Sequence, residues 1–249
     1  MQFVGCTNVL IEGVTLIDAP FWVVHPVFCT NVIVRGITID SPHINNDGVD
    51  PDACVDVLIE RNVITSGDDC VAIKSGRDAD AWQVGQPSRN LIVRNNTCYG
   101  PGNGFAVGSE LSGGVENVYI QQNTIVAGET ALDFKSNLDR GAWVKDIVVD
   151  GLTAGQVSGC LSWTNDYHGG RGGHFPTLFQ NFSISNVQCA QASKTAISAV
   201  GLPDMPIREV ILQNVTVSQA ETATKFKHTK GFDFTNVQVN GKTILAPSS

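Results

Sequence analysis

Short stretches in which apolar and polar residues alternate recur along the whole chain. Most of them start with Asn or Asp. They continue with apolar residues at alternate positions and have Gly or Asn near the middle, as in NVLIEGVTL and NVIVRGITI. Alternation with a period of two and many Val, Ile and Thr residues predict strands with one buried face. The Gly or Asn tolerates a positive φ and therefore predicts a bend. The nine repeats start at Asn8, Asn31, Asp56, Asn90, Asn117, Asp146, Asn181, Glu209 and Gly231.

The spacing of these repeats selects the fold class. Successive starts lie 22 to 35 residues apart, whereas a propeller blade needs ~40 or more residues in antiparallel hairpins. No stretch shows a convincing helical period. We therefore predict an all-β fold, a right-handed single-stranded parallel β-helix of about nine coils that forms a single domain over residues 1–249. Each coil would stack its strands on those of its neighbours at ~4.8 Å.

The cysteines follow the same repeat. Cys6, Cys29 and Cys54 each precede a repeat start by two residues, which predicts an inward ladder of stacked free thiols. Cys98 and Cys189 share a second position, eight residues after their starts, and are expected to be small buried hydrophobic side chains. No C-x-x-C pair occurs among the seven cysteines, so neither a zinc ribbon nor a redox motif is expected. We expect no cofactor and no structural metal.

Composition and charge exclude several classes of protein. The formal net charge is −8 and no basic stripe is present, so nucleic acid is not an expected partner. No apolar run approaches the ~20 residues of a membrane span, and no membrane partner is expected. The N-terminal residues do not resemble a signal peptide. The sequence leaves the oligomeric state open.

Two acidic clusters carry the candidate chemistry. Asp47 lies in NNDGVDPDAC, and Asp68 and Asp69 lie in SGDDCVAIKSG, at similar distances from the starts of adjacent repeats. Similar offsets in adjacent coils predict one face, with the carboxyl groups about one strand spacing apart. Carboxylates this close raise the pKa of at least one member. A protonated carboxyl beside a carboxylate is the acid and base pair of glycoside hydrolysis.

Two other interpretations of these aspartates stay open. Asp beside Gly is ordinary turn chemistry, so each residue could be a turn residue. Clustered carboxylates could also form a calcium site, to which Asp50 and Asp52 would add oxygen ligands.

Polar residues at comparable offsets in later coils extend the same face into a groove. These candidate substrate-binding residues are Asn103, Asp133, Lys135 and Tyr167. The expected partner is therefore a polysaccharide, and Tyr167 could stack on or hydrogen-bond a sugar.

The stretches that contain these aspartates resemble those of a known family. NNDGVDPDAC followed by SGDDCVAIKSG, with GSELSGGVENVYI downstream, resembles the pectin-degrading polygalacturonases of glycoside hydrolase family twenty-eight, over nearly all of residues 1–240. The resemblance implies a parallel β-helix and hydrolysis with inversion. It implies Asp68 as the general acid, with Asp47 and Asp69 as the bases that position water. It also implies a secreted or periplasmic enzyme.

Two positions depart from the family pattern. The family usually has Gly-His-Gly where this chain has Asn103 between glycines, and Arg-Ile-Lys where this chain has Asp133, Phe134 and Lys135. An aspartate in place of the arginine that holds a uronate carboxylate would repel that group by roughly 1 kcal/mol or more. Rhamnogalacturonan or a less charged glycan is therefore also a candidate substrate.

The function suggested by these residues has two rivals. The leading hypothesis is an inverting hydrolase of pectin-like polysaccharide. A non-catalytic glycan-binding or structural β-helix, and a calcium-dependent polysaccharide lyase on the same fold, remain as alternatives. Family members usually carry further N-terminal sequence, so we also expect either a fragment or a short form whose first coil exposes a strand edge.

Overall fold

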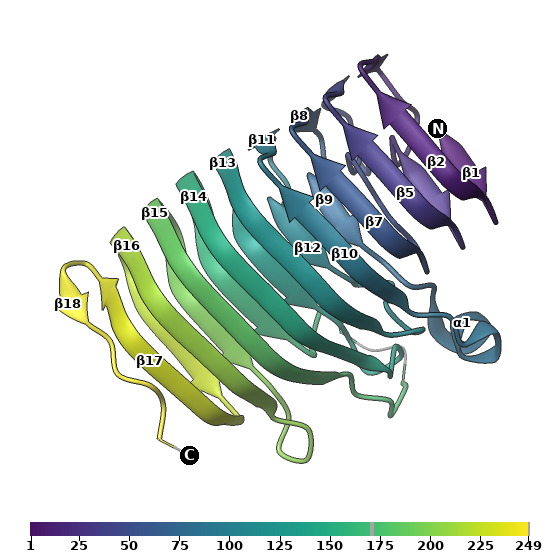
Figure 1. Ribbon diagram of the computed structural model, residues 1–249. Helices are drawn as coiled ribbons and strands as arrows, with labels where there is room; N and C mark the ends of the chain where they lie inside the picture. Colours follow the sequence, from purple (N-terminus) through teal and green to yellow (C-terminus); the bar gives the residue numbers. More distant parts are fainter. Residues whose placement is uncertain (170–171, 249) are drawn as a thin grey trace.

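The fold was determined as a computed structural model, in which residues 1–169 and 172–248 are described. The chain winds into a stack of coils whose strands pair in parallel (Figure 1). This arrangement confirms the predicted right-handed parallel β-helix. One long sheet contains a strand from every predicted repeat: β2(Thr7–Glu12), β5(Thr30–Arg35), β7(Val55–Glu60), β10(Ser88–Arg94), β13(Val115–Lys135), β14(Trp143–Thr164), β15(Leu178–Val200), β16(Ile207–Lys227) and β17(Thr229–Val239).

The repeat starts have a specific backbone conformation. Each of these nine strands begins one to three residues before its predicted start, and the start residue itself has a positive φ, from 55° at Asn117 to 68° at Gly231. Asn and Asp tolerate this conformation better than most residues. Their side chains also bond along the stack: Asn31 Nδ2 donates to Asn8 Oδ1 at 2.6 Å, and Asn117 Nδ2 donates to Asn90 Oδ1 at 2.7 Å. The repeated Asn or Asp thus serves both the bend and the stacking.

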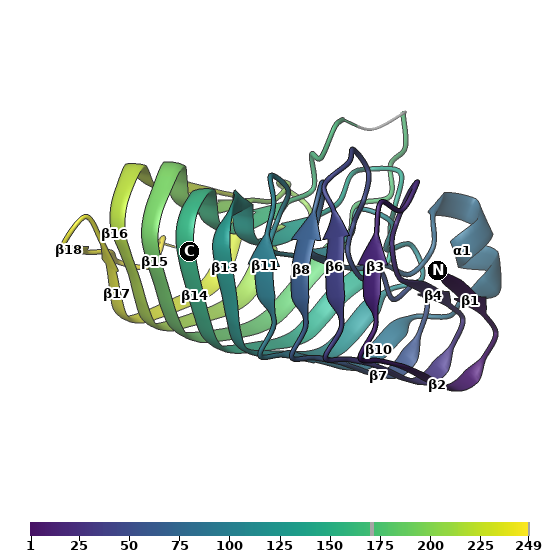
Figure 2. The ribbon, with the colours of Figure 1, turned by 90° about the horizontal axis from the view of Figure 1, so that it is seen from above.

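The other faces of the coils use shorter strands until β13. Figure 2 shows one such face, on which consecutive coils lie side by side. From β13 to β16, strands of 21 to 23 residues run around most of the coil. The remaining short strands are β1(Gln2–Val4), β3(Thr15–Ile17), β4(His25–Val27), β6(Thr38–Ser41), β8(Val63–Ser66), β9(Val71–Ile73), β11(Thr97–Tyr99), β12(Phe105–Val107) and β18(Lys242–Thr243).

The interior is apolar and contains the expected cysteine ladder. Cys29 Sγ lies 3.4 Å from the Cys6 nitrogen, and Cys54 Sγ lies 3.4 Å from the Cys29 nitrogen. All three are free thiols, and Cys29 and Cys54 are fully buried. Burial raises the pKa of the Cys54 thiol to about 12. The ladder prediction is therefore confirmed.

One cysteine pairing was not predicted. Cys98 is buried, as expected, but it forms a disulfide with Cys70, with their Cα atoms 5.9 Å apart. Cys70 directly follows Asp69, and Cys98 lies on β11 in the neighbouring coil. The bond therefore fastens the turn that carries the acidic residues to the next coil. Cys189 is free and buried, as expected.

A short helix was also not expected. Helix α1(Asp78–Val84) follows β9 and projects from the side of the stack (Figure 1). Its seven residues are too few to show a helical period, and Ala81 is its buried residue. The helix accounts for part of the long interval between the third and fourth repeats. No helix in the described part of the chain is long and apolar enough to cross a membrane.

Candidate functional site

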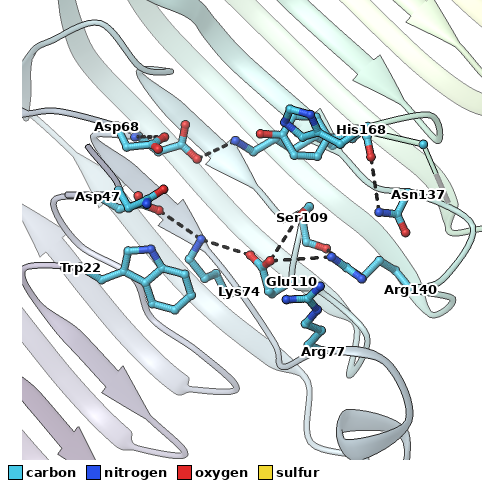
Figure 3. A pocket seen from close by; sticks show the side chains of 16 residues that line it. Trp22, Asp47, Asp68, Lys74, Arg77, Ser109, Glu110, Asn137, Arg140 and His168 are labelled. Carbon is cyan, nitrogen blue, oxygen red and sulfur yellow. Dashed lines mark hydrogen bonds and ion pairs between the residues drawn. The ribbon is translucent and has the colours of Figure 1, made fainter. Parts of the chain in front are cut away.

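A pocket of about 350 Å³ opens on the flank of the stack, where several coils end in loops (Figure 3). Trp22, before β4, forms one wall. Asp47 comes from the loop between β6 and β7, and Asp68 and Asp69 come from the turn between β8 and β9. Glu110 follows β12 on the far side. The three predicted catalytic aspartates therefore lie in one pocket.

Backbone pairing between coils brings these aspartates together. The Gly48 nitrogen, next to Asp47, donates to the Asp69 carbonyl at 2.9 Å. The Cys70 nitrogen, next to Asp69, donates to the Asn103 carbonyl at 2.8 Å. Asp47, Asp69 and Asn103 therefore occupy corresponding levels of three successive coils, as the matched offsets predicted.

Asp69 is the most tightly held of the three. It is 2% exposed, and Lys135 Nζ donates to its Oδ2 at 2.7 Å. Asn103 Nδ2 donates to Oδ1, also at 2.7 Å. Burial is the largest single influence and lowers the pKa of Lys135, but Asp69, Tyr167 and Asp133 together outweigh it, so the pKa of the ammonium group is raised. Lys135 also lies over the Tyr167 ring, 4.9 Å from its centre, so Asp69 and Lys135 form a fixed ion pair beneath the tyrosine.

Asp47 is paired with a second buried lysine, which the sequence did not single out. Lys74 Nζ lies 3.1 Å from Asp47 Oδ2, and 3.5 Å from both Asp50 Oδ1 and Glu110 Oε2. It also lies 4.2 Å from the centre of the Trp22 ring. Burial raises the pKa of Asp47, and Lys74 opposes that rise. The available signal was the lysine of VAIKSG, which directly follows the apolar run that forms β9.

Asp68 has a different environment. It is half-buried, and the structure places none of the described cationic groups within ion-pair distance of its carboxyl group. Its Oδ1 accepts a hydrogen bond from the Asp69 nitrogen at 2.9 Å. Burial raises the pKa of Asp68, the negative charge of Asp69 adds to the rise, and Lys135 opposes it. The sequence predicted a raised pKa from like charges, but burial is the larger cause.

The structure places two predicted substrate-binding residues behind the pocket wall. Neither Asn103 nor Asp133 is among the described residues that line it, whereas Lys135 and Tyr167 are. Asn103 holds Asp69, and its Oδ1 accepts from the Thr130 nitrogen at 3.1 Å. Both residues therefore support the site from within. This geometry does not favour the predicted contact of either residue with a substrate.

Asp133 is 7% exposed, two residues before Lys135 on β13. Burial raises its pKa to about 6, while Lys135 and a hydrogen bond with Ser162 oppose the rise. Ser162 is its register partner on β14. The strand alternation that turns Phe134 into the core turns Asp133 outward, but neighbouring strands cover it.

The pocket also contains residues that sequence reasoning missed. Arg77 follows β9, Arg140 lies in the loop after β13, and His168 packs edge-on against Tyr167 with ring centres 4.1 Å apart. Arg140 is 4% exposed, and its Nε donates to the Ser109 carbonyl at 2.9 Å. No sequence repeat marks these residues, because they lie in loops of unequal length.

The calcium interpretation has no support in the geometry. Within residues 1–169 and 172–248, no group of three or more His, Cys, Asp and Glu side chains is arranged to hold a metal ion. Lysine ammonium groups occupy the positions between the carboxylates, so Asp47 and Asp69 bind Lys74 and Lys135.

Comparison with known sequences identifies relatives along most of the chain. Residues 1–242 match the family described as Glycosyl hydrolases family 28. A probable polygalacturonase from Vitis vinifera is 35% identical over 231 residues, covering 90% of this chain and 47% of that protein. A polygalacturonase from Cryptomeria japonica is 32% identical over 230 residues, covering 90% and 38%. The chain thus spans about half the length or less of these relatives.

Solved structures show the same relationship. An exopolygalacturonase from Thermotoga maritima matches with a TM-score of 0.84 and 32% identity, covering 97% of this chain and 54% of that one. A polygalacturonase from Erwinia carotovora matches with a TM-score of 0.71 and 22% identity, covering 96% and 58%, and supports the fold alone. With the family match over residues 1–242, these findings show that the chain belongs to glycosyl hydrolase family 28.

Proposed function

We propose that this chain hydrolyses glycosidic bonds in a pectin-like polysaccharide, polygalacturonan, rhamnogalacturonan or a related glycan, with inversion at the anomeric carbon. The observation that carries the proposal is the different pairing of the three pocket aspartates. Asp47 and Asp69 each have a lysine ammonium group within 3.1 Å, whereas Asp68 is half-buried and has no such partner among the residues that the structure describes. One carboxyl group is thus left to donate a proton, and two are held in place by ammonium groups.

This division assigns the roles. Asp68, with its raised pKa, acts as the general acid and protonates the leaving glycosidic oxygen. Asp47 and Asp69 act as the bases that orient and activate a water molecule on the opposite side of the sugar ring. An inverting mechanism needs room for that water, which corresponds to carboxyl groups ~6.5–9.5 Å apart. Lys74 opposes the rise that burial causes in the pKa of Asp47, and the two lysines hold the two bases in position.

The two departures from the family pattern leave this chemistry intact. Asn103 cannot titrate as histidine does, but its amide still holds Asp69 at 2.7 Å. Asp133 is buried behind the pocket, so its charge does not stand on the surface that a substrate would contact. The family relationship also supports a secreted protein. The non-catalytic alternative therefore has no specific observation in its favour, and it is tested as an outcome below.

Hydrolysis and its absence are distinguished by one set of assays. The wild type should release reducing ends from polygalacturonate or rhamnogalacturonan, and NMR of the first product should show the inverted anomer. Unsaturated product, detected by ultraviolet absorbance, would instead indicate a lyase. Binding of the polysaccharide without any product would indicate a non-catalytic module.

The role of Asp68 is tested by an isosteric substitution. Asp68→Asn should abolish turnover, because an amide cannot donate the acid's proton. The matched control is Asp40→Asn, at an exposed position on β6, which should leave activity unchanged. Full activity of Asp68→Asn would refute the assignment.

A further inference from the structure

Four Lys and Arg side chains line the pocket, and three of them are already engaged. Lys135 is bound to Asp69, and Lys74 lies among three carboxylates. Arg140 uses Nε for the Ser109 carbonyl and Nη1 for Asp78 Oδ1 at 2.6 Å. The side chains of these three cations are only 3 to 5% exposed, so they support the pocket from within.

Arg77 is the exception. Its side chain is 45% exposed, and its ion pair runs through Nε to Asp78 Oδ2 at 3.5 Å. Among the described residues, none accepts a hydrogen bond from its guanidinium group. Figure 3 shows this group beside Glu110 and Arg140, at the edge of the pocket below Lys74. Arg77 therefore has hydrogen-bond donors to offer a bound molecule.

Asp78 lies on the Nε side of the Arg77 guanidinium group. Its Oδ1 accepts a hydrogen bond from Arg140 Nη1 at 2.6 Å, and its Oδ2 forms the longer ion pair with Arg77, so one carboxylate lies between two guanidinium groups at the same wall. Asp78 is itself held, because its backbone nitrogen donates to Ser112 Oγ at 2.7 Å. The Nε side of Arg77 thus faces a held carboxylate, and the Nη atoms remain for a ligand. A preorganised guanidinium group loses less conformational entropy on binding than a free one.

We propose that Arg77 binds a carboxylate of the sugar chain, so that the pocket recognises a uronate at this edge. This inference rests on the proposed function and specifies its substrate class. A guanidinium group matches a carboxylate in a bidentate geometry, which a neutral sugar does not offer. On β13, the buried Asp133 occupies the position of the family's usual arginine, and Lys135 is hydrogen-bonded to Asp69. The carboxylate of the uronate would therefore be recognised after the end of β9 and not on β13.

Three variants test the proposal on matched substrates. Arg77→Gln removes the charge and keeps much of the length, Arg77→Lys keeps the charge and loses the fork, and Arg89→Gln is the control at an exposed position on β10. Each is assayed on oligogalacturonate with free carboxylates and on its methyl ester. Arg77→Gln should raise KM for the free acid about 10- to 100-fold, the range of a lost charge-assisted hydrogen bond. KM for the ester should stay unchanged, Arg77→Lys should be intermediate, and kcat should change less than KM.

A binding measurement separates failure of this inference from failure of the proposed function. In an Asp68→Asn background, which should bind without turnover, calorimetry with saturated oligogalacturonate should show the same loss of affinity for Arg77→Gln. That result supports the inference even if the wild type hydrolyses none of the glycans. Equal affinity and KM for Arg77→Gln and Arg89→Gln would overturn it while leaving hydrolysis intact. An equal loss on acid and ester, with a lower Tm, would also overturn it and make Arg77 a support for α1.

Discussion

Lys74 should be the residue on which the stability of the site depends most. Its side chain is 3% exposed and lies within 3.1 to 3.5 Å of carboxylate oxygens of Asp47, Asp50 and Glu110. Lys74→Met removes the ammonium group and leaves buried carboxylates without their cation. Breaking a buried ion pair from one side costs about 3–5 kcal/mol of unfolding free energy. For a chain of this size that corresponds to a fall in Tm of about 6–20 °C.

The loss should depend on pH in a defined direction. Burial raises the pKa of Asp50 well above its usual range, and Lys74 opposes the rise. Without Lys74, the carboxyl groups in the folded state hold their protons to a still higher pH. A group whose pKa is raised by folding favours the folded state while it is protonated, and this contribution is lost as pH rises through the folded pKa. Lys74→Met should therefore lose more stability at pH 8 than at pH 4.5, and adding Asp50→Asn should restore part of the loss.

Thermal and urea unfolding followed by circular dichroism at both pH values measure this effect. Lys145→Met is the control, because that lysine pairs with Glu116 at 3.2 Å while 40% exposed. An exposed pair contributes about 0–1 kcal/mol. A loss below about 1 kcal/mol for Lys74→Met at pH 8, or the same loss at both pH values, would refute the reasoning.

Three further perturbations probe the acid turn. Replacing Cys70 and Cys98 with Ala opens a loop of 28 residues and should lower the free energy of unfolding by about 3–4 kcal/mol, and an unchanged urea midpoint would contradict this. Gly102→Ala places a Cβ against the Asp68 backbone and should displace the acid, so kcat should fall about tenfold or more. Unchanged kcat with unchanged Tm would count against that contact. Because Asp68 must be protonated to act and burial raises its pKa, kcat/KM should decline as pH rises through that pKa. A rate that increases with pH throughout this range would exclude Asp68 as the acid.

The fold could be predicted from the sequence because its repeating signal is local. Alternation along each strand defines which face is buried, and the Asn or Asp at each start adopts the positive φ that the coil requires. The cysteine ladder follows from the same periodicity, since equal positions in stacked coils must meet. Matched offsets also predicted that Asp47 and Asp69 would lie in adjacent coils, where Gly48 and Asp69 are hydrogen-bonded.

The details that govern chemistry were decided only by the tertiary structure. The helix that carries Asp78, the loop that carries Arg140 and the pairing of Cys70 with Cys98 belong to segments that break the repeat. Offsets counted along the chain say which coil a residue joins, but not which neighbouring side chain covers it. Asp133, for example, which the sequence places beside a substrate, is buried and does not line the pocket. Burial and ion pairing depend on contacts between coils, and a one-dimensional pattern does not contain them.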